Sequence, residues 1–122
     1  HLMLSDVRDV YASARIEFGK TLLKAGKLDE AKAEIVAAQA YGGDTQVADA
    51  YMLLGLAELF GSHCQQALFD FAKAREASLA PDKFISLYEG VTLRDCAKNA
   101  AGAQKLFDEY ERLRKAEETP LR

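Results

Sequence analysis

The sequence is poor in residues that interrupt helices and in residues that build covalent frameworks. Its 122 residues include two prolines, two cysteines, two histidines and no tryptophan. Two cysteines cannot form a framework of several disulfides, which excludes the class of small disulfide-rich secreted scaffolds. The longest nearly apolar run, residues 51–57, is far too short to cross a bilayer, so we expect no membrane insertion.

Positive charge is not in excess either. The 16 Lys and Arg residues are outnumbered by 19 Asp and Glu, which gives a net charge of -3. Nucleic acid is therefore a poor candidate partner, because binding phosphates relies on surplus Lys and Arg gathered on one face. No signal peptide is visible at the start. We predict a cytoplasmic protein, with a mature periplasmic domain as the alternative.

Domain organisation follows from the length. We expect residues 1–4 to be vector residues or the cut edge of a longer polypeptide, and residues 5–122 to form a single domain. Alanine and leucine dominate this domain, and its apolar residues recur at the three- and four-residue spacing of a helix. The sequence therefore predicts an all-α fold. Six helices are expected, over residues 6–25, 28–41, 45–60, 62–79, 81–96 and 99–117.

Three start signals support these helices. Ser62 with Gln65 has the pattern of a capping box, Asp44 is expected to cap the third helix, and Pro81 suits the first turn of the fifth.

The chain also repeats itself with a period near 36 residues. Gly19, Gly55 and Gly90 are separated by 36 and 35 residues, and three further sets keep a period of 36. These sets are Ala31, Ala67 and Ala103; Ile35, Phe71 and Phe107; and Ala38, Ala74 and Tyr110. The Gly-to-Ala spacing is 12 in the first two repeats and 13 in the third. We interpret the chain as a repeat array; the alternative is a non-repeating helical bundle with accidental periodicity.

The repeated residues resemble the tetratricopeptide repeat. The middle repeat carries the family's markers Tyr51, Leu54-Gly55, Ala67, Phe71 and Pro81. Glu58 stands where the family prefers Tyr. The resemblance implies three helix-turn-helix hairpins, over about 12–44, 45–80 and 81–117, stacked as a right-handed α-α superhelix, or solenoid, with a concave side.

Ser62, His63 and Cys64 are the residues closest to a catalytic pattern. Neighbours on a helix project about 100° apart, so His63 is poorly placed to activate Cys64, and we predict no enzyme activity. Cys64 and Cys96 fall near turns at the same edge of neighbouring hairpins. With His63 they leave a metal site one ligand short, so we predict no metal or other cofactor. Two reduced thiols are expected; a reactive Cys64, a structural zinc and a disulfide are the alternatives.

The resemblance further implies that one stripe of the first helix of each hairpin lines the concave groove. By register the groove residues are Ile16, Lys20, Lys24, Met52, Leu56, Phe60, Phe84, Leu87, Val91 and Arg94. The helix over 45–60 is apolar almost all round, and such a helix is normally covered. The alternative is that these apolar residues belong to the ordinary core.

We predict a protein-interaction module or scaffold that holds a peptide or helical segment of a partner protein in this groove. Apolar contact is expected from Met52, Leu56, Phe60, Phe84 and Leu87, while Lys20, Lys24 and Arg94 would select an acidic neighbour. The alternatives are a self-associating structural repeat domain, forming a homo-oligomer, and a fragment of a longer repeat protein.

Overall fold

The computed structural model describes residues 4–118, and these contain helices and turns but no strand. The elements are α1 (Leu4–Lys24), α2 (Leu28–Gln39), α3 (Asp44–Phe60), α4 (Cys64–Ala77), α5 (Lys83–Val91), a π-helical turn η1 (Thr92–Cys96) and α6 (Ala100–Glu118). The all-α prediction is confirmed, and the helices begin and end within two residues of the expected positions, with one exception: α5 ends at Val91, five residues early, and η1 covers the rest of the expected fifth segment. Of the expected chain edge, residues 1–3 lie outside the described part, and Leu4 begins α1.

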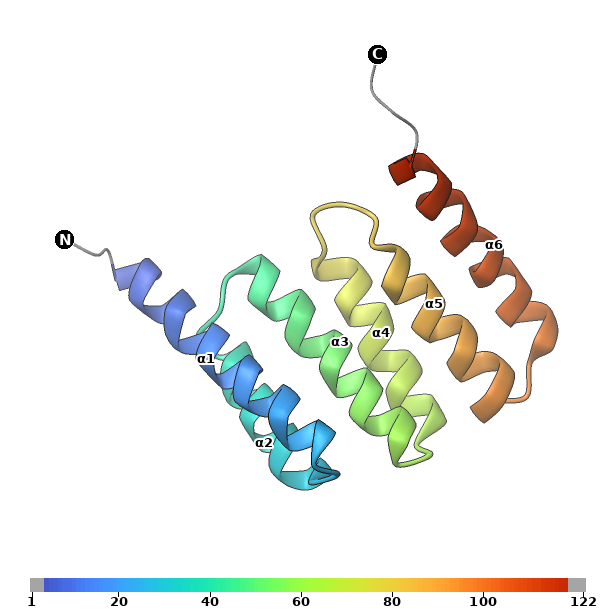
Figure 1. Ribbon diagram of the computed structural model, residues 1–122. Helices are drawn as coiled ribbons and strands as arrows, with labels where there is room; N and C mark the ends of the chain where they lie inside the picture. Colours follow the sequence, from blue (N-terminus) through green and yellow to red (C-terminus); the bar gives the residue numbers. More distant parts are fainter. Residues whose placement is uncertain (1–3, 119–122) are drawn as a thin grey trace, which may run out of the picture.

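The helices form three consecutive pairs. α1 packs on α2, α3 on α4, and α5 on α6, while α2 meets α3 and α4 meets α5 between the pairs. Figure 1 shows the pairs in a row in chain order, with α1 and α6 at opposite ends. The turns within each pair lie along one edge of the row, and the connections between pairs lie along the other (Figure 1).

Each pair closes on the same contact between a glycine and a large side chain. A Cβ added at Gly55 would lie 2.5 Å from the Phe71 ring, and one at Gly90 would lie 2.5 Å from the Phe107 ring. At Gly19 the added atom would lie 2.8 Å from Ile35. The sequence period therefore has a packing cause, because a residue without a Cβ lets the partner helix seat its large side chain against the backbone.

The turns within the pairs share one backbone conformation. Gly26, Ser62 and Lys98 all have positive φ, of 76°, 62° and 58°. After Gly26 and Ser62 the chain makes the paired hydrogen bonds of a Schellman motif, such as the His63 N–H donating to the Glu58 carbonyl at 2.8 Å. The capping box predicted at Ser62 is wrong, because Ser62 lies in the turn after α3 with φ in the left-handed region and α4 begins only at Cys64.

Two other start signals are also displaced. The N-cap of α3 is Gly43, and Asp44 is already the first helical residue. Pro81 precedes the start of α5, whose N-cap is Asp82: its side chain accepts a hydrogen bond from the Phe84 N–H at 2.8 Å. Because the Asp82 carboxylate satisfies this otherwise unpaired amide, the helix begins two residues later than proline alone predicted.

The longer Gly-to-Ala spacing of the third repeat is absorbed by η1. There the Ala97 N–H donates to the Thr92 carbonyl at 2.9 Å, a bond that spans one residue more than in an α-helix. The wider turn accommodates the extra residue, so the contact between Gly90 and Phe107 is the same as the contact between Gly55 and Phe71 in the second pair.

Two apolar clusters form the core. The first is built from Ala12, Ile16, Ile35, Ala38, Ala50, Leu53 and Leu54, at the junction of the first and second pairs. The second is built from Ala67, Phe71, Ala74 and Ile85, at the junction of the second and third. Each pair therefore buries much of its apolar surface against its neighbours in the row.

Candidate protein-binding surface

The ten predicted groove residues differ widely in exposure. Ile16 is only 4% exposed and belongs to the first core cluster, so its assignment to a groove is wrong. The helical period places it beside Ala12, on the side of α1 that faces α2 and α3. Met52, Leu56, Leu87 and Val91 are half-buried. Phe60 and Phe84 are 62% and 44% exposed.

An apolar surface connects several of these residues across two pairs. Phe84 stacks on Tyr88 with ring centroids 6.3 Å apart, and Tyr88 contacts the buried Phe71 at 6.0 Å. Met52 and Leu56 of α3 pack against the same core cluster as Tyr88. We call Met52, Leu56, Phe84 and Tyr88 the groove patch. Tyr88 was missed in the sequence, although its position four residues after Phe84 places it on the same helix face.

The three cations expected to select an acidic partner are all exposed, but two are engaged locally. Lys20 pairs with Glu17 at 3.1 Å. Arg94 pairs with Asp95 at 2.7 Å and lies over the Phe107 ring, 5.3 Å from its centroid. Lys24 is the last residue of α1. Exposed ion pairs are worth little, so a partner carboxylate could compete for either cation.

Glu58, at the position where the tetratricopeptide pattern has Tyr, is a buried carboxylate at the centre of a charge cluster whose other members, Lys32 and His63, reach solvent. Its carboxylate is paired with the Lys32 ammonium from α2 and lies 3.0 Å from His63 Nδ1. Burial alone would raise the pKa of Glu58, but the hydrogen bonds and charges of Lys32 and His63 lower it below its ordinary value. Burial, with the nearby negative charge of Glu58, raises the pKa of Asp70 to about 6. The cluster joins the first pair to the second by an ion pair.

Cys64 and Cys96 form a disulfide, so the prediction of two reduced thiols is wrong. Cys64 begins α4 and Cys96 ends η1, and their Cα atoms are 5.6 Å apart, within the usual range for bonded cysteines. The bond links the second pair to the third at the edge where the helices of each pair turn. A thiol held in a disulfide is not a thiolate nucleophile, which removes the feature that pointed to a reactive Cys64.

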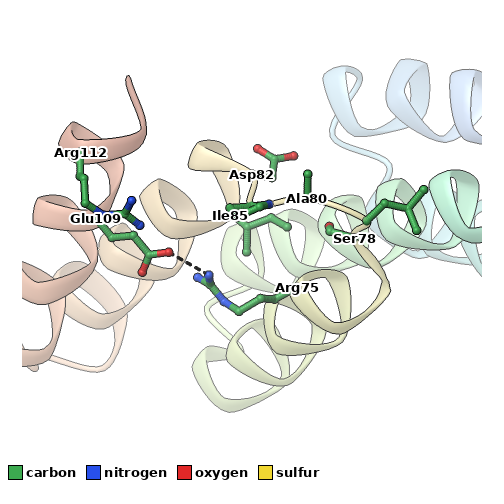
Figure 2. Close-up of a pocket in the computed structure, with 9 residues that line it drawn as sticks. Arg75, Ser78, Ala80, Asp82, Ile85, Glu109 and Arg112 are labelled. Atoms are coloured by element: carbon green, nitrogen blue, oxygen red, sulfur yellow. Dashed lines mark hydrogen bonds and ion pairs between the residues drawn. The ribbon is translucent and has the colours of Figure 1, made fainter. Parts of the chain in front are cut away.

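The inter-pair connection at residues 78–82 borders a hollow of about 280 Å³ (Figure 2). Its lining comes from the end of α4, this connection, the start of α5 and the middle of α6: Arg75, Ser78, Leu79, Ala80, Pro81, Asp82, Ile85, Glu109 and Arg112. Arg75 crosses it to Glu109 at 3.2 Å and also pairs with Glu89. The Ser78 hydroxyl donates to the Ala74 carbonyl at 2.8 Å, so its proton is engaged. These contacts make the hollow a structural junction.

The described residues offer neither a metal site nor a membrane-spanning helix. Among residues 4–118 no three His, Cys, Asp or Glu side chains converge as a metal site would require. In the same part of the chain no helix combines the length and the apolar character needed to traverse a bilayer.

Comparison with known proteins identifies no relative: no family model, curated protein or solved structure matches the chain significantly. The tetratricopeptide resemblance accordingly stays a prediction drawn from the residues themselves.

Proposed function

We propose that this chain is a non-enzymatic, tetratricopeptide-like interaction module whose three pairs stack as a right-handed solenoid. Three observations favour the repeat assignment: the recurring glycine contacts, the recurring positive-φ turns and the serial packing of the pairs. Stacks of this kind offer an extended surface to partner chains.

The partner in this proposal is an apolar, extended or helical protein segment that lies on the groove patch. The observation that carries the proposal is the stacked pair of Phe84, which is exposed, and Tyr88, which contacts the buried Phe71. Met52 and Leu56 pack against the same core cluster as Tyr88. Aromatic and methionine side chains suit such a surface because they offer a large, adaptable contact area. Lys20, Lys24 and Arg94 lie on the exposed surface and would favour an acidic residue beside the apolar segment.

The test compares two exposed phenylalanines. Peptides are selected from a displayed random 16-residue library on the wild-type protein, and their affinities for Phe84→Glu and Phe69→Glu are measured by fluorescence anisotropy. Phe69 is 55% exposed on α4, outside the groove patch, and serves as the matched control. Loss of one apolar anchor should weaken binding at least about tenfold, corresponding to about 1.4 kcal/mol, in Phe84→Glu only.

Equal affinities for the two variants, or no peptide selected above background, would contradict the groove assignment. Circular dichroism checks that both variants keep wild-type helix content. Leu56 is a poor test position, because it packs against both core clusters and a charge there would act on folding.

For the compartment, the disulfide favours the periplasmic alternative over the cytoplasm. Disulfides persist in oxidising compartments and are rare where thioredoxin and glutathione keep thiols reduced. We therefore propose that the protein works in an oxidising compartment. Free-thiol titration of the protein isolated from its native cells tests this, with none expected; two titratable thiols per chain would overturn it.

A further inference from the structure

Exposed apolar side chains gather on the first helix pair. Of the ten large apolar residues that are exposed in the described part of the chain, six belong to this pair or to the turn after it. They are Val7, Val10, Tyr11, Phe18, Val36 and Tyr41. So many exposed apolar side chains on one pair indicate a surface that is covered in the functional assembly.

The internal repeat identifies this surface as a seat for a helix. Tyr11, Ala14, Arg15 and Phe18 stand 36 residues before Val47, Ala50, Tyr51 and Leu54. In the second pair Ala50 is 0% and Leu54 is 7% exposed, because both belong to the cluster that includes Ile35 and Ala38 of α2. In the first pair Phe18 is 52% exposed.

The four residues of the first pair, with Glu34, line an open hollow of about 240 Å³. Against the second pair, α2 covers the face of α3 that carries Ala50 and Leu54. In the described part of the chain, no helix covers the equivalent face of α1. We call Tyr11, Ala14, Arg15 and Phe18 the end seat.

The ion pairs at the two junctions between helix pairs differ from the ion pair at the end seat. This difference indicates what kind of surface would bind at the end seat. At the inner junctions the preceding helix supplies a cation to the next pair: Lys32 reaches Glu58, and Arg75 reaches Glu89 and Glu109. At the end seat the cation comes from the same pair, since Arg15 donates to Glu34 at 2.6 Å and also to the Tyr11 hydroxyl. The seat is already neutralised, so it suits an apolar, uncharged surface.

The far end of the row is not such a surface. The exposed side of α6 carries Gln104, Asp108 and Glu111. Covering the end seat with α6 of another copy would bury these polar groups against Phe18, at a cost in desolvation. Head-to-tail stacking of copies is therefore disfavoured.

We propose that the end seat is the interface of a two-fold homodimer, in which α1 packs antiparallel on α1 of a second copy. A two-fold contact requires a self-complementary face. The end seat meets this requirement because the small Ala14 lies between Tyr11, three residues before it, and Phe18, four residues after it. An antiparallel crossing at Ala14 brings each Tyr11 toward the Phe18 of the other copy. Arg15, the charged residue of the seat, is paired with Glu34, so pairing the seat with itself brings no net like charge together.

Molar mass measured by light scattering over a range of protein concentrations tests the dimer. The wild type should reach twice the mass of the 13.4 kDa chain, and Phe18→Glu should remain a monomer at concentrations where the wild type is dimeric. Phe60→Glu alters a phenylalanine outside the end seat that is somewhat more exposed than Phe18, 62% against 52%, and should dimerise like the wild type. A wild type that is monomeric at every concentration, or equal behaviour of the two variants, would overturn the proposal.

A cysteine placed at the crossing point tests the geometry. The described residues contain no free cysteine, so Ala14→Cys adds one reactive thiol to a protein whose own cysteines are bonded. Under mild oxidation it should give a covalent dimer on a non-reducing gel, while Ala33→Cys, exposed on α2, should not. Dimers that form without cross-linking at position 14 would overturn the two-fold arrangement, as would masses that grow beyond two copies. Peptide binding at the groove patch should be unaffected by Phe18→Glu, so the two proposals fail independently.

Discussion

Cys64 and Cys96 are bonded to each other across the boundary between the second and third helix pairs. They are separated by 32 positions in the sequence, so the bond closes a loop that contains all of α4 and α5. A loop of this size removes much of the conformational freedom of the unfolded chain.

Breaking this bond should therefore destabilise the protein. We expect the double variant Cys64→Ser/Cys96→Ser to lose roughly 3–4 kcal/mol of unfolding free energy, measured by urea titration. Dithiothreitol should lower the stability of the wild type by a similar amount and leave the double variant unchanged. Identical urea midpoints for the wild type with and without reductant would show that the bond does not constrain the chain.

The left-handed turn residues offer a stabilising substitution. Ser62 and Lys98 hold positive φ at the positions where the first turn has Gly26. A side chain costs roughly 1–2 kcal/mol in this conformation, partly offset by the freedom that glycine regains on unfolding. We expect Ser62→Gly and Lys98→Gly each to gain about 0.5–1 kcal/mol in thermal unfolding. Gly26→Ala is the control and should lose a comparable amount; a loss of stability in both glycine variants would contradict the argument.

The close approach at Gly55 should be sensitive to one methyl group. In Gly55→Ala the new Cβ would lie 2.5 Å from the fully buried Phe71 ring. Overpacking costs roughly 1–3 kcal/mol, reduced by about 1 kcal/mol of helix propensity. Chemical denaturation of Gly55→Ala should show a net loss of unfolding free energy. In the double variant Gly55→Ala/Phe71→Leu the smaller side chain at position 71 should relieve part of the overpacking, so the two losses should not add. Additive losses in that double-mutant cycle would mean that the two residues do not share the contact.

Asp70 should make the stability depend on pH. Its pKa is raised to about 6 in the folded protein, above the ordinary 3.8, mainly by burial and also by Glu58. The folded state therefore binds this proton more tightly than the unfolded state, and Asp70 lowers stability as the pH rises from about 4 to about 6.

Asp70→Asn removes this titration. At pH 7 we expect it to be more stable than the wild type by about 1–3 kcal/mol, with a smaller advantage at pH 4, by urea unfolding at each pH. The exposed Glu30→Gln is the control and should follow the wild type. An Asp70→Asn advantage that is equal at both pH values would assign the effect to something other than this proton.

The positions of the helices were predictable because they depend on local signals. Apolar spacing located all six segments, and the period of 36 marked the residues that recur in each helix pair. That Gly55 meets the Phe71 ring inside its pair was visible only in the structure. The start signals at Ser62 and Pro81 were misread because the same residue types serve helix starts and the turns before them. Only the backbone conformation separates the two roles.

The candidate site was less accessible to prediction. Register alone assigned Ile16 to the groove, although α2 and α3 both contact α1 and the residue is in the core. The register assignment also left out Tyr88, whose ring bridges Phe84 and Phe71.

The sequence by itself determined the helical class and the number of helices, since both depend on apolar spacing within short segments. Tertiary structure decided what depends on neighbouring repeats: the bond between Cys64 and Cys96, the ion pair between Lys32 and Glu58, and the exposure of Phe18 where the equivalent Leu54 is buried. Burial and bonding depend on both of the surfaces that meet, whereas the pattern of residues along one segment describes only its own surface. Equivalent residues therefore have different environments when one pair packs against a preceding pair and the other, in the described part of the chain, does not.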